Sequence, residues 1–331
     1  MHNFALIGAA GYIAPRHMKA IQETGNQLVA ALDPNDSVGV LDSYFPDSRF
    51  FTEFERFDRY VDLLRRRGTS LDYVSIASPN YLHDSHIRFA LRVGAHAVCE
   101  KPLVVNPWNA ESLKDVEAES GRRVFTILQL RLHPNIVALR EKVAKAVAED
   151  PDVRFQVELT YVTSRGSWYF ASWKGQEKKS GGIAANIGIH FYDMLIWVFG
   201  PPVGSRVDVL TDAYGSGALA FRNADARWFL SVRADDLPEG ARERGQRTWR
   251  SITLDGEEIA FSDGFTDLHT ESYRHILAGG GFGLDDALPS IELVYAIRTE
   301  PPAGVSDASH PLAIRAQRRG ADARPFPART A

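Results

Sequence analysis

The first 128 residues alternate between short apolar runs and longer segments with helical spacing. Apolar runs lie at residues 3–8, 28–32, 72–77, 96–99 and 124–128, and most are bounded by Gly, Pro, Asn or Asp. Runs of this length favour buried strands. Between them, apolar residues three and four positions apart predict helices at residues 13–24, 57–67, 81–93 and 106–120. Strands that alternate with helices predict a doubly wound parallel sheet, so we expect an α/β domain of the Rossmann type over residues 1–128.

The pattern changes near Gln129. Residues 131–147 predict a helix, and residues 153–162 alternate as a half-buried strand. Short alternating strands follow between residues 206 and 261, separated by turns such as Asp255-Gly256, and residues 271–277 and 285–298 predict closing helices. We therefore expect a second, α+β domain with a mostly antiparallel sheet over residues 129–300. Residues 301–331 are rich in Pro, Ala and Arg and predict a flexible tail.

Residues 181–199 predict a helix that ends at Gly200-Pro201-Pro202. On a regular helix Asn186, His190 and Asp193 fall at i, i+4 and i+7 and therefore share one face. A lone histidine is more often a satisfied interior side chain than a functional one. A histidine between an amide and a carboxylate, however, suits a site that holds a substrate hydroxyl.

Composition narrows the class of protein. The chain has 331 residues, 44% of them hydrophobic and 24% charged, which is typical of a soluble two-domain protein. The net charge of −4 gives no reason to expect nucleic acid or a membrane surface as partner. No apolar run reaches the roughly 20 residues that span a bilayer, and no signal segment is evident at the N-terminus. The single cysteine fits a reducing compartment, so we expect a cytoplasmic protein. The ten histidines show no metal-binding spacing, and we expect no metal site.

A glycine turn, Gly8-Ala9-Ala10-Gly11, lies between the first strand and the first helix. In this context glycines let the backbone approach a dinucleotide pyrophosphate, and the helix N-terminus offers it free N–H groups. The spacing has one residue more between the first two glycines than the usual motif, and Ala14 stands at the third position. Asp33, at the end of the second strand, can accept hydrogen bonds from ribose hydroxyls and would repel the extra phosphate of NADP. We therefore expect NAD, although an aspartate before Pro34 is also common in turns.

The strand at residues 96–99 brings Glu100-Lys101-Pro102 to its carboxyl end. Ligands of open α/β sheets bind beyond the carboxyl ends of the strands, so Lys101 is a candidate site residue. Ser78-Pro79-Asn80 and His83 follow the preceding strand, where the histidine could line a cofactor or cap a surface helix.

The segment at residues 165–174 is dense in aromatic residues and cations. Such side chains can stack a base or sugar and neutralise a phosphate or carboxylate. The alternative is a loop that packs its aromatic residues inward. The residues concerned are Arg165, Trp168, Tyr169, Phe170, Trp173 and Lys174.

Taken together, residues 8–14, Asp33, residues 100–102 and residues 181–193 resemble the glucose–fructose oxidoreductase/inositol dehydrogenase (Gfo/Idh/MocA) family. The resemblance extends from about residue 3 to residue 298. Residues 14–19, 165–174 and 261–269 resemble one bacterial branch, the UDP-N-acetyl-2-amino-2-deoxy-D-glucuronate 3-dehydrogenases. That branch implies NAD-dependent oxidation of the C3 hydroxyl of a UDP-sugar uronate to a 3-keto sugar, for surface polysaccharide such as O-antigen. It also implies reoxidation of NADH by 2-oxoglutarate and a homotetramer built through the second-domain sheet.

The resemblance also implies roles for individual residues. The family's catalytic lysine, aspartate and histidine correspond to Lys101, Asn186 and His190, and the amide at Asn186 departs from the family pattern. Because an amide cannot stabilise an imidazolium by charge, the base is either His190 or Lys101, with His190 the better candidate from its ordinary pKa. Cofactor contacts are expected from Gly8, Gly11, Tyr12, Ile13, Asp33, Ser78, Pro79, Asn80, His83, Glu100 and Lys101. Substrate contacts are expected from Arg16, Lys101, Arg165, Tyr169, Trp173, Asn186 and His190.

Three other functions fit the same pattern. The scaffold could oxidise another sugar or a cyclitol, because fold does not fix substrate. It could belong to an NAD-dependent glycosidase, which also begins with oxidation at C3. A non-catalytic NAD-binding sensor is the third, and the presence of both Lys101 and His190 argues against it.

Overall fold

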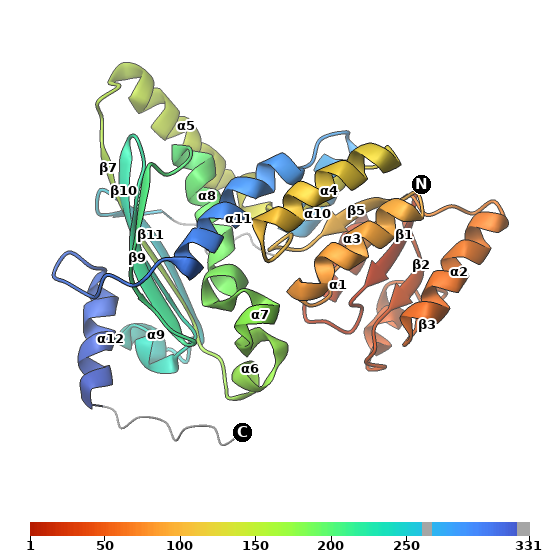
Figure 1. Cartoon of the computed structure of the whole chain (residues 1–331), viewed down its shortest axis with the longest axis horizontal. Helices are drawn as coiled ribbons and strands as arrows, with labels where there is room; N and C mark the ends of the chain where they lie inside the picture. The colour runs from red at the N-terminus through yellow and green to blue at the C-terminus, as the bar shows by residue number, and fades with distance from the viewer. Residues whose placement is uncertain (260–266, 323–331) are drawn as a thin grey trace.

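The computed structural model describes residues 1–259 and 267–322, with side chains in the last helix described as far as Arg319. The motif residues 261–266 and the tail residues 323–331 therefore lie outside the described part of the chain. Figure 1 shows two sheets, each with its own helices, lying beside one another.

The N-terminal sheet is fully parallel, with the order β3-β2-β1-β4-β5-β6. Its order is that of a Rossmann fold, which confirms the predicted doubly wound sheet. The short β3 was not predicted. The strands are β1 Asn3–Ile7, β2 Gln27–Leu32, β3 Arg49–Phe51, β4 Tyr73–Ile76, β5 His96–Cys99 and β6 Val124–Thr126. The helices that connect them are α1 Ala14–Glu23, α2 Phe54–Arg66, α3 His83–Arg92 and α4 Pro107–Ser120.

The second sheet has the order β12-β11-β7-β10-β9-β8, and only the β7–β10 pair is parallel. The prediction of a mostly antiparallel sheet is therefore confirmed. Its strands are β7 Phe155–Thr163, β8 Gly204–Leu210, β9 Tyr214–Ala220, β10 Ala224–Ser231, β11 Thr248–Leu254 and β12 Glu257–Glu258. One face carries α5 Pro134–Glu149, α8 Ile189–Phe199 and α11 Leu284–Thr299 (Figure 1). Shorter helices are α6 Trp168–Ala171, α7 Glu177–Ser180 and α9 Glu239–Glu243.

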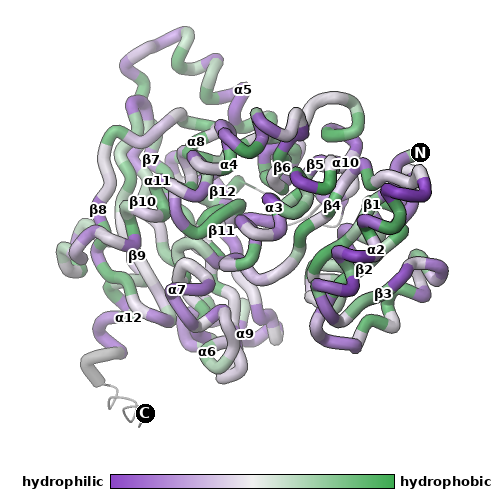
Figure 2. The backbone as a smooth tube through the Cα atoms, turned by 45° about the vertical axis from the view of Figure 1, so that its right-hand side comes forward, coloured by the Kyte–Doolittle hydropathy of each residue, from purple (hydrophilic) through white to green (hydrophobic). Residues whose placement is uncertain are grey.

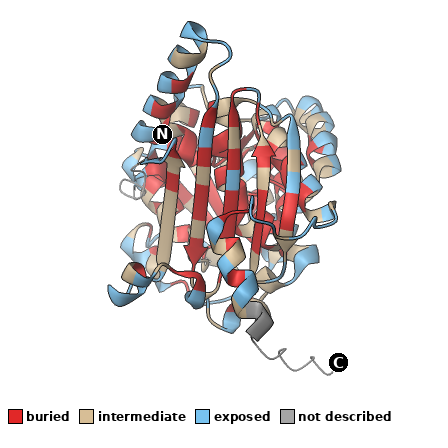
Figure 3. Ribbon diagram, turned by 90° about the vertical axis from the view of Figure 1, so that its left-hand side faces the viewer, coloured by how far each residue is buried: buried red, intermediate tan, exposed pale blue. Residues whose placement is uncertain are grey.

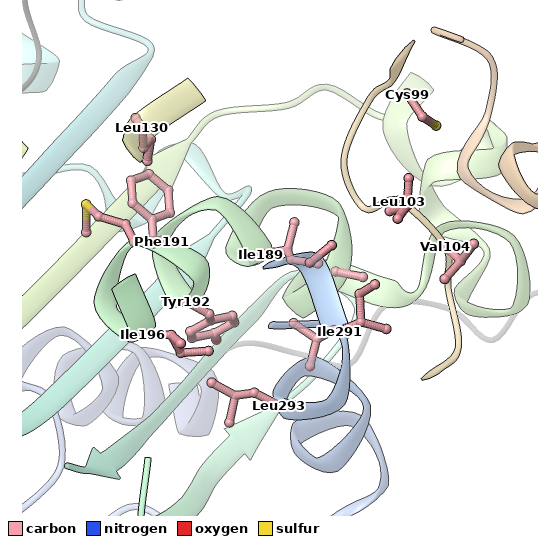
Figure 4. Packing of buried hydrophobic residues seen from close by; sticks show 14 of the residues in the cluster. Cys99, Leu103, Val104, Leu130, Ile189, Phe191, Tyr192, Ile196, Ile291 and Leu293 are labelled. Atoms are coloured by element: carbon pink, nitrogen blue, oxygen red, sulfur yellow. The ribbon is translucent and has the colours of Figure 1, made fainter. Parts of the chain in front are cut away.

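The core of the second domain forms around α8. Its apolar side chains, among them Tyr192, pack against Ile291 of α11, as Figure 4 shows. The ring of Trp228 from β10 meets Tyr192 edge-on at 5.5 Å. Trp228 can lie flat across β9 because residue 217 is glycine: a Cβ there would stand 2.8 Å from the indole ring. Apolar residues concentrate along the strands in this way, whereas polar residues lie on the outer helices (Figure 2).

One helix of the expected second domain packs on the first. α10 Leu268–Leu277 lies against α1, and Tyr273 and Ile276 are part of the core cluster that contains Ile21. Lys19 and Asp267 form an ion pair of 2.9 Å beside this contact. Although α10 lies within the expected second domain of residues 129–300, it therefore also packs on the first domain through its apolar face.

The expected flexible tail is also wrong for part of its length. Residues 311–322 form α12 Pro311–Asp322, which lies on the face of the second sheet opposite α8 (Figure 3). Ala313 and Ala316 are buried there against Val162 and Phe229. Two small apolar residues three positions apart let the helix approach the sheet closely.

By length and composition, the continuous helical segment at residues 177–199 could cross a membrane. Of its most apolar window, however, 72% is buried inside the protein, so this segment is a core helix. The sequence alone had not indicated a segment of that length, because Glu177, Lys178 and Lys179 interrupt the apolar pattern.

Candidate active site

The glycine turn after β1 approaches the end of β4 closely. Gly8 has φ +93°, and a Cβ there would stand 2.5 Å from the carbonyl carbon of Ala77. The N–H of Gly11 donates to the carbonyl of Gly8 at 3.1 Å, which closes the turn in front of α1. No side chain caps α1, and its first turn has no acidic residue that would repel an anion, although the N–H groups of Ala14 and Arg16 already donate to the carbonyls of Gly11 and Ile13. The turn therefore fits a dinucleotide pyrophosphate.

Asp33 lies beside this turn at the end of β2. One carboxylate oxygen accepts the N–H of Ala10 at 3.0 Å, and the other accepts the N–H of Asn35 at 2.8 Å. The carboxylate is thus fixed in place while each oxygen keeps a second lone pair for a ribose hydroxyl. Tyr12 is 90% exposed on the outer side of the turn, and Ile13 is half-buried at the start of α1. Their contacts with the cofactor remain predictions.

The residues after β4 that were expected to contact the cofactor mostly form hydrogen bonds to neighbouring loops. The Ser78 hydroxyl lies 2.8 Å from His86 Nδ1, and the Asn80 amide donates to the carbonyl of Ser180 at 2.8 Å. His83 is buried, with its two ring nitrogens 2.8 Å from the carbonyl oxygens of Pro102 and Ser78. Because both nitrogens lie at hydrogen-bond distance from backbone carbonyls, His83 connects the loops after β4 and β5, and its expected contact with the cofactor stays a prediction. Pro79 is half-buried between Ser78 and Asn80.

Glu100, which was expected to contact the cofactor, forms hydrogen bonds with three residues of the protein. His17 Nε2 and His269 Nε2 lie 3.1 and 2.8 Å from one oxygen of Glu100, and the other oxygen accepts the N–H of Lys101 at 3.3 Å. Burial would raise the pKa of Glu100, but the hydrogen bonds from His17 and His269 hold it well below its usual value. Glu100 therefore ties α1 and α10 to the loop that carries Lys101.

His17, Glu100 and His269 are residue types that can bind a metal, and their ligand atoms lie within 4.8 Å of one another. The carboxylate oxygen already accepts a hydrogen bond from each histidine. His17 continues the network through its other nitrogen to the Tyr273 hydroxyl at 2.8 Å, which in turn lies 2.6 Å from the Ser75 hydroxyl. Hydrogen bonding accounts for the arrangement.

The segment expected to form one regular helix contains a wider turn. Residues Ala184–Gly188 form a π-helix that precedes α8. The Asn186 amide donates to the Tyr169 hydroxyl at 2.9 Å, whereas the buried Asp193 forms a bidentate pair with Arg131 at 2.7 and 3.0 Å. The expected common face is therefore wrong for Asp193, because the π-turn changes the rotation between residues 186 and 193. π-Bulges of this kind are frequent at functional sites.

Lys101 lies in a group of four cations. Arg16 and Arg165 both influence Lys101 electrostatically, and Lys101 and Arg165 influence Lys174. None of the four side chains forms an ion pair with a residue in the described ranges. Burial lowers the pKa of Lys101, the carboxylate of Glu100 raises it, and the charges of Arg16 and Arg165 lower it further. We call Arg16, Lys101, Arg165 and Lys174 the cation cluster; it offers positive charge to an anionic ligand.

His190 is half-buried at the start of α8 and makes no hydrogen bond within the described part of the chain. Burial lowers its pKa well below the usual value, and the positive charge of Lys101 lowers it further. The ring is therefore neutral at pH 7 and can accept a proton. A neutral imidazole can take the proton of an alcohol. A nearby ammonium can stabilise the negative charge that then develops on the oxygen.

For the aromatic segment at residues 165–174 the sequence left two roles open, ligand binding and inward packing, and its residues differ in burial accordingly. Tyr169 is 2% exposed and its hydroxyl accepts the hydrogen bond of Asn186, so it packs inward, and its expected contact with the substrate stays a prediction. Trp173 is half-buried and Trp168 is 50% exposed. Lys174, one of the cations noted in this segment, lies over the Trp173 ring at 4.3 Å, although it was not in the list of expected substrate contacts. Its position in an aromatic segment was a signal that could have identified it.

The fold and the site define an NAD-binding oxidoreductase. Residues 2–128 match the family model "Oxidoreductase family, NAD-binding Rossmann fold", and residues 153–229 match "Oxidoreductase family, C-terminal alpha/beta domain". The chain belongs to the Gfo/Idh/MocA oxidoreductase family, as its motifs had indicated.

The chain is similar to the WlbA (WbpB) dehydrogenase from Thermus thermophilus, with 52% identity, a TM-score of 0.89, and coverage of 94% of this chain and 99% of that one. That enzyme is known in complex with NAD and alpha-ketoglutarate and with NAD and UDP-GlcNAcA. The WlbA dehydrogenase from Bordetella pertussis shares the fold, at 22% identity over 92% of this chain and 97% of that one, with a TM-score of 0.72.

Among curated sequences, D-glucoside 3-dehydrogenase from Escherichia coli is 31% identical over 137 residues, covering 41% of this chain and 38% of that protein. Over the first three relatives of this kind the chain spans 38%, 52% and 56% of their length.

Proposed function

We propose that the protein is an NAD-dependent dehydrogenase that oxidises the C3 hydroxyl of UDP-N-acetyl-2-amino-2-deoxy-D-glucuronate (UDP-GlcNAcA) to the 3-keto sugar. The observation that carries this proposal is a neutral His190 that feels the positive charge of Lys101, within a cluster of cations that have no ion-pair partner among the described residues. A UDP-sugar uronate would supply the missing negative charge through its diphosphate and its carboxylate. The similar Thermus enzyme, which binds UDP-GlcNAcA, supports this choice of substrate.

The chemistry follows from the protonation states. His190 is neutral at pH 7, so its ring can take the proton of the C3 hydroxyl as the C–H bond breaks. The ammonium of Lys101 stabilises the negative charge that develops on the C3 oxygen. When bound, NAD accepts the hydride that leaves C3. The carbonyl forms at C3, and the proton remains on His190 until solvent removes it.

Asn186 has a supporting role in this scheme. Its amide nitrogen donates to the buried Tyr169 hydroxyl, which fixes the side-chain orientation and leaves the amide oxygen available. That oxygen can accept a hydrogen bond from a sugar hydroxyl. Because the amide of Asn186 is neutral, it does not offset the positive charge of Lys101, as an aspartate at position 186 would.

We also infer that 2-oxoglutarate regenerates the oxidised cofactor. Its keto group would take the hydride from NADH together with one proton and leave as 2-hydroxyglutarate, and its two carboxylates suit the cation cluster. The Thermus relative binds alpha-ketoglutarate beside NAD, which supports the inference. A cytoplasmic homotetramer that serves the synthesis of surface polysaccharide completes the proposal, and light scattering of the purified protein would test the tetramer.

The deciding experiment incubates the protein with NAD, 2-oxoglutarate and UDP-GlcNAcA and follows 2-hydroxyglutarate and the keto sugar by mass spectrometry. Both products should appear in equal amounts. UDP-GlcNAc, which lacks only the carboxylate, should react at least about tenfold less efficiently, since it leaves a cation of the cluster unpaired. Equal kcat/KM for the two sugars, or good activity on free inositol or glucose, would overturn the substrate assignment.

A further inference from the structure

Lys174 is held in a rigid turn at the edge of the site. It belongs to the 3₁₀ turn Trp173–Gly175, where the Ser172 hydroxyl oxygen accepts its backbone N–H at 3.3 Å. The same hydroxyl donates to the Tyr169 carbonyl at 2.9 Å. At Gly175 the chain approaches Phe170 so closely that a Cβ would stand 2.5 Å from its Cα. The backbone of this turn is therefore fixed against α6, which places the Lys174 stem reproducibly.

The ammonium of Lys174 has no anionic partner among the residues the structure describes. It is half-buried, and its closest described contact is the Trp173 ring at 4.3 Å. Lys101 and Arg165 repel it, and the carboxylate of Glu100 attracts it while remaining bonded to two histidines. A partly buried ammonium among like charges costs free energy, and an anionic oxygen placed among them would recover it.

We propose that Lys174 is a further ligand-binding residue of this site, where its ammonium pairs with an anionic oxygen of the bound substrate or co-substrate. The inference rests on the proposed function and adds a residue to it. The anionic oxygen belongs to the diphosphate, to the uronate carboxylate or to a carboxylate of 2-oxoglutarate. These three sources share one chemistry, and separate titrations distinguish them.

Binding through Lys174 has a measurable signature. Burial, together with the positive charges of Lys101 and Arg165, lowers the pKa of Lys174 to about 8, and the carboxylate of Glu100 opposes part of this effect. At pH 8 about half of the Lys174 side chains are therefore neutral in the free protein. An anion raises the pKa of a neighbouring ammonium, so ligand binding at pH 8 takes up about half a proton, and uptake disappears near pH 6.

Other titratable groups near Lys174 must be separated from it. Lys101 also has a lowered pKa, whereas His190 is neutral at this pH. Lys174→Arg keeps the charge but cannot titrate, and Lys174→Met removes the charge. Lys178→Met is the matched control, because Lys178 is exposed on the neighbouring helix α7.

The test is isothermal titration of NAD-saturated protein at pH 8, in two buffers with different ionisation enthalpies. UDP, UDP-GlcNAcA and 2-oxoglutarate are titrated separately. Lys174→Met should lose about tenfold or more in affinity for at least one of them and should lose the proton uptake. Lys174→Arg should keep the affinity and lose the uptake, and Lys178→Met should match the wild type.

Affinities of Lys174→Met within twofold of the wild type for all three ligands, with NAD binding intact, would overturn the inference. Failure of the wild type to bind UDP-GlcNAcA would instead refute the proposed function. The UDP and 2-oxoglutarate titrations would in that case still decide the role of Lys174.

Discussion

Replacing Arg131 by leucine should destabilise the protein strongly, because Arg131 neutralises the buried carboxylate of Asp193 in α8, the helix that carries His190. Its guanidinium donates to both oxygens of Asp193, to the carboxylate of Asp286 at 3.1 Å, and to the Asp286 carbonyl at 2.8 Å. It also stacks on Phe282 at 5.0 Å. Arg131 is 6% exposed and Asp193 is 2% exposed, so water cannot replace these bonds.

The magnitude follows from the partner that is left behind. Removing one member of a buried ion pair leaves an uncompensated charge and costs about 3–5 kcal/mol. Burial already raises the pKa of Asp193, and Arg131 opposes that rise, so without Arg131 the carboxyl group would protonate and limit the loss. Arg131→Leu combined with Asp193→Leu should recover part of the stability, because it removes both charges at once.

The assay is urea unfolding at pH 7, followed by the fluorescence of the six tryptophans. Arg154→Leu is the matched control: Arg154 forms a bidentate pair with Asp225 at 2.7 Å, but both side chains are largely exposed. Its loss of stability should be much smaller, since water and salt screen an exposed pair. A loss for Arg131→Leu no larger than that for Arg154→Leu would refute the reasoning. Turnover should also fall in Arg131→Leu, because α8 carries His190.

Two further predictions concern cofactor and chemistry. NAD should bind at least about tenfold more tightly than NADP, and Asp33→Ala should narrow that gap; equal affinities in the wild type, measured by fluorescence titration, would contradict the role of Asp33. Lys101→Ala and His190→Ala should each lower turnover by about 10²-fold or more with NAD affinity nearly unchanged. Lys101→Met should in addition raise the pKa of His190, because it removes a positive neighbour that disfavours the imidazolium. The acidic limb of the kcat/KM profile should then move to higher pH. An unchanged limb would mean that another residue is the base.

Periodicity predicted most of the fold because each element buries one face. The strand at residues 96–99 was predicted with its exact bounds, and the glycine turn was placed correctly between β1 and α1. β3 was not predicted, because a strand of three residues is too short to show an alternating hydrophobic pattern. α12 was not predicted, because a segment whose buried residues are two alanines has the same composition as a solvated tail.

Contacts between distant segments could not be predicted in the same way. Nothing local in residues 268–277 indicates that α10 packs on α1, or that His269 reaches Glu100 from so far along the chain. Regular helical spacing also assigned Asp193 to the same face as Asn186, because a π-turn between them has no clear pattern in a single sequence. The cluster around Lys101 was predicted in part, since Arg16 and Arg165 lie in recognisable segments and Lys174 was not assigned to the site.

The position of α10 determines when the NAD-binding half can be completed during synthesis. The ribosome releases β1 to β6 first, but α1 then lacks Tyr273 and Ile276, and Glu100 lacks His269. The whole second sheet, from β7 to β12, must be translated before α10 emerges and closes this half. A fragment that ends near residue 128 is therefore an unfinished folding unit, and a nascent chain stalled before residue 278 exposes the apolar side of α1 to chaperones and proteases.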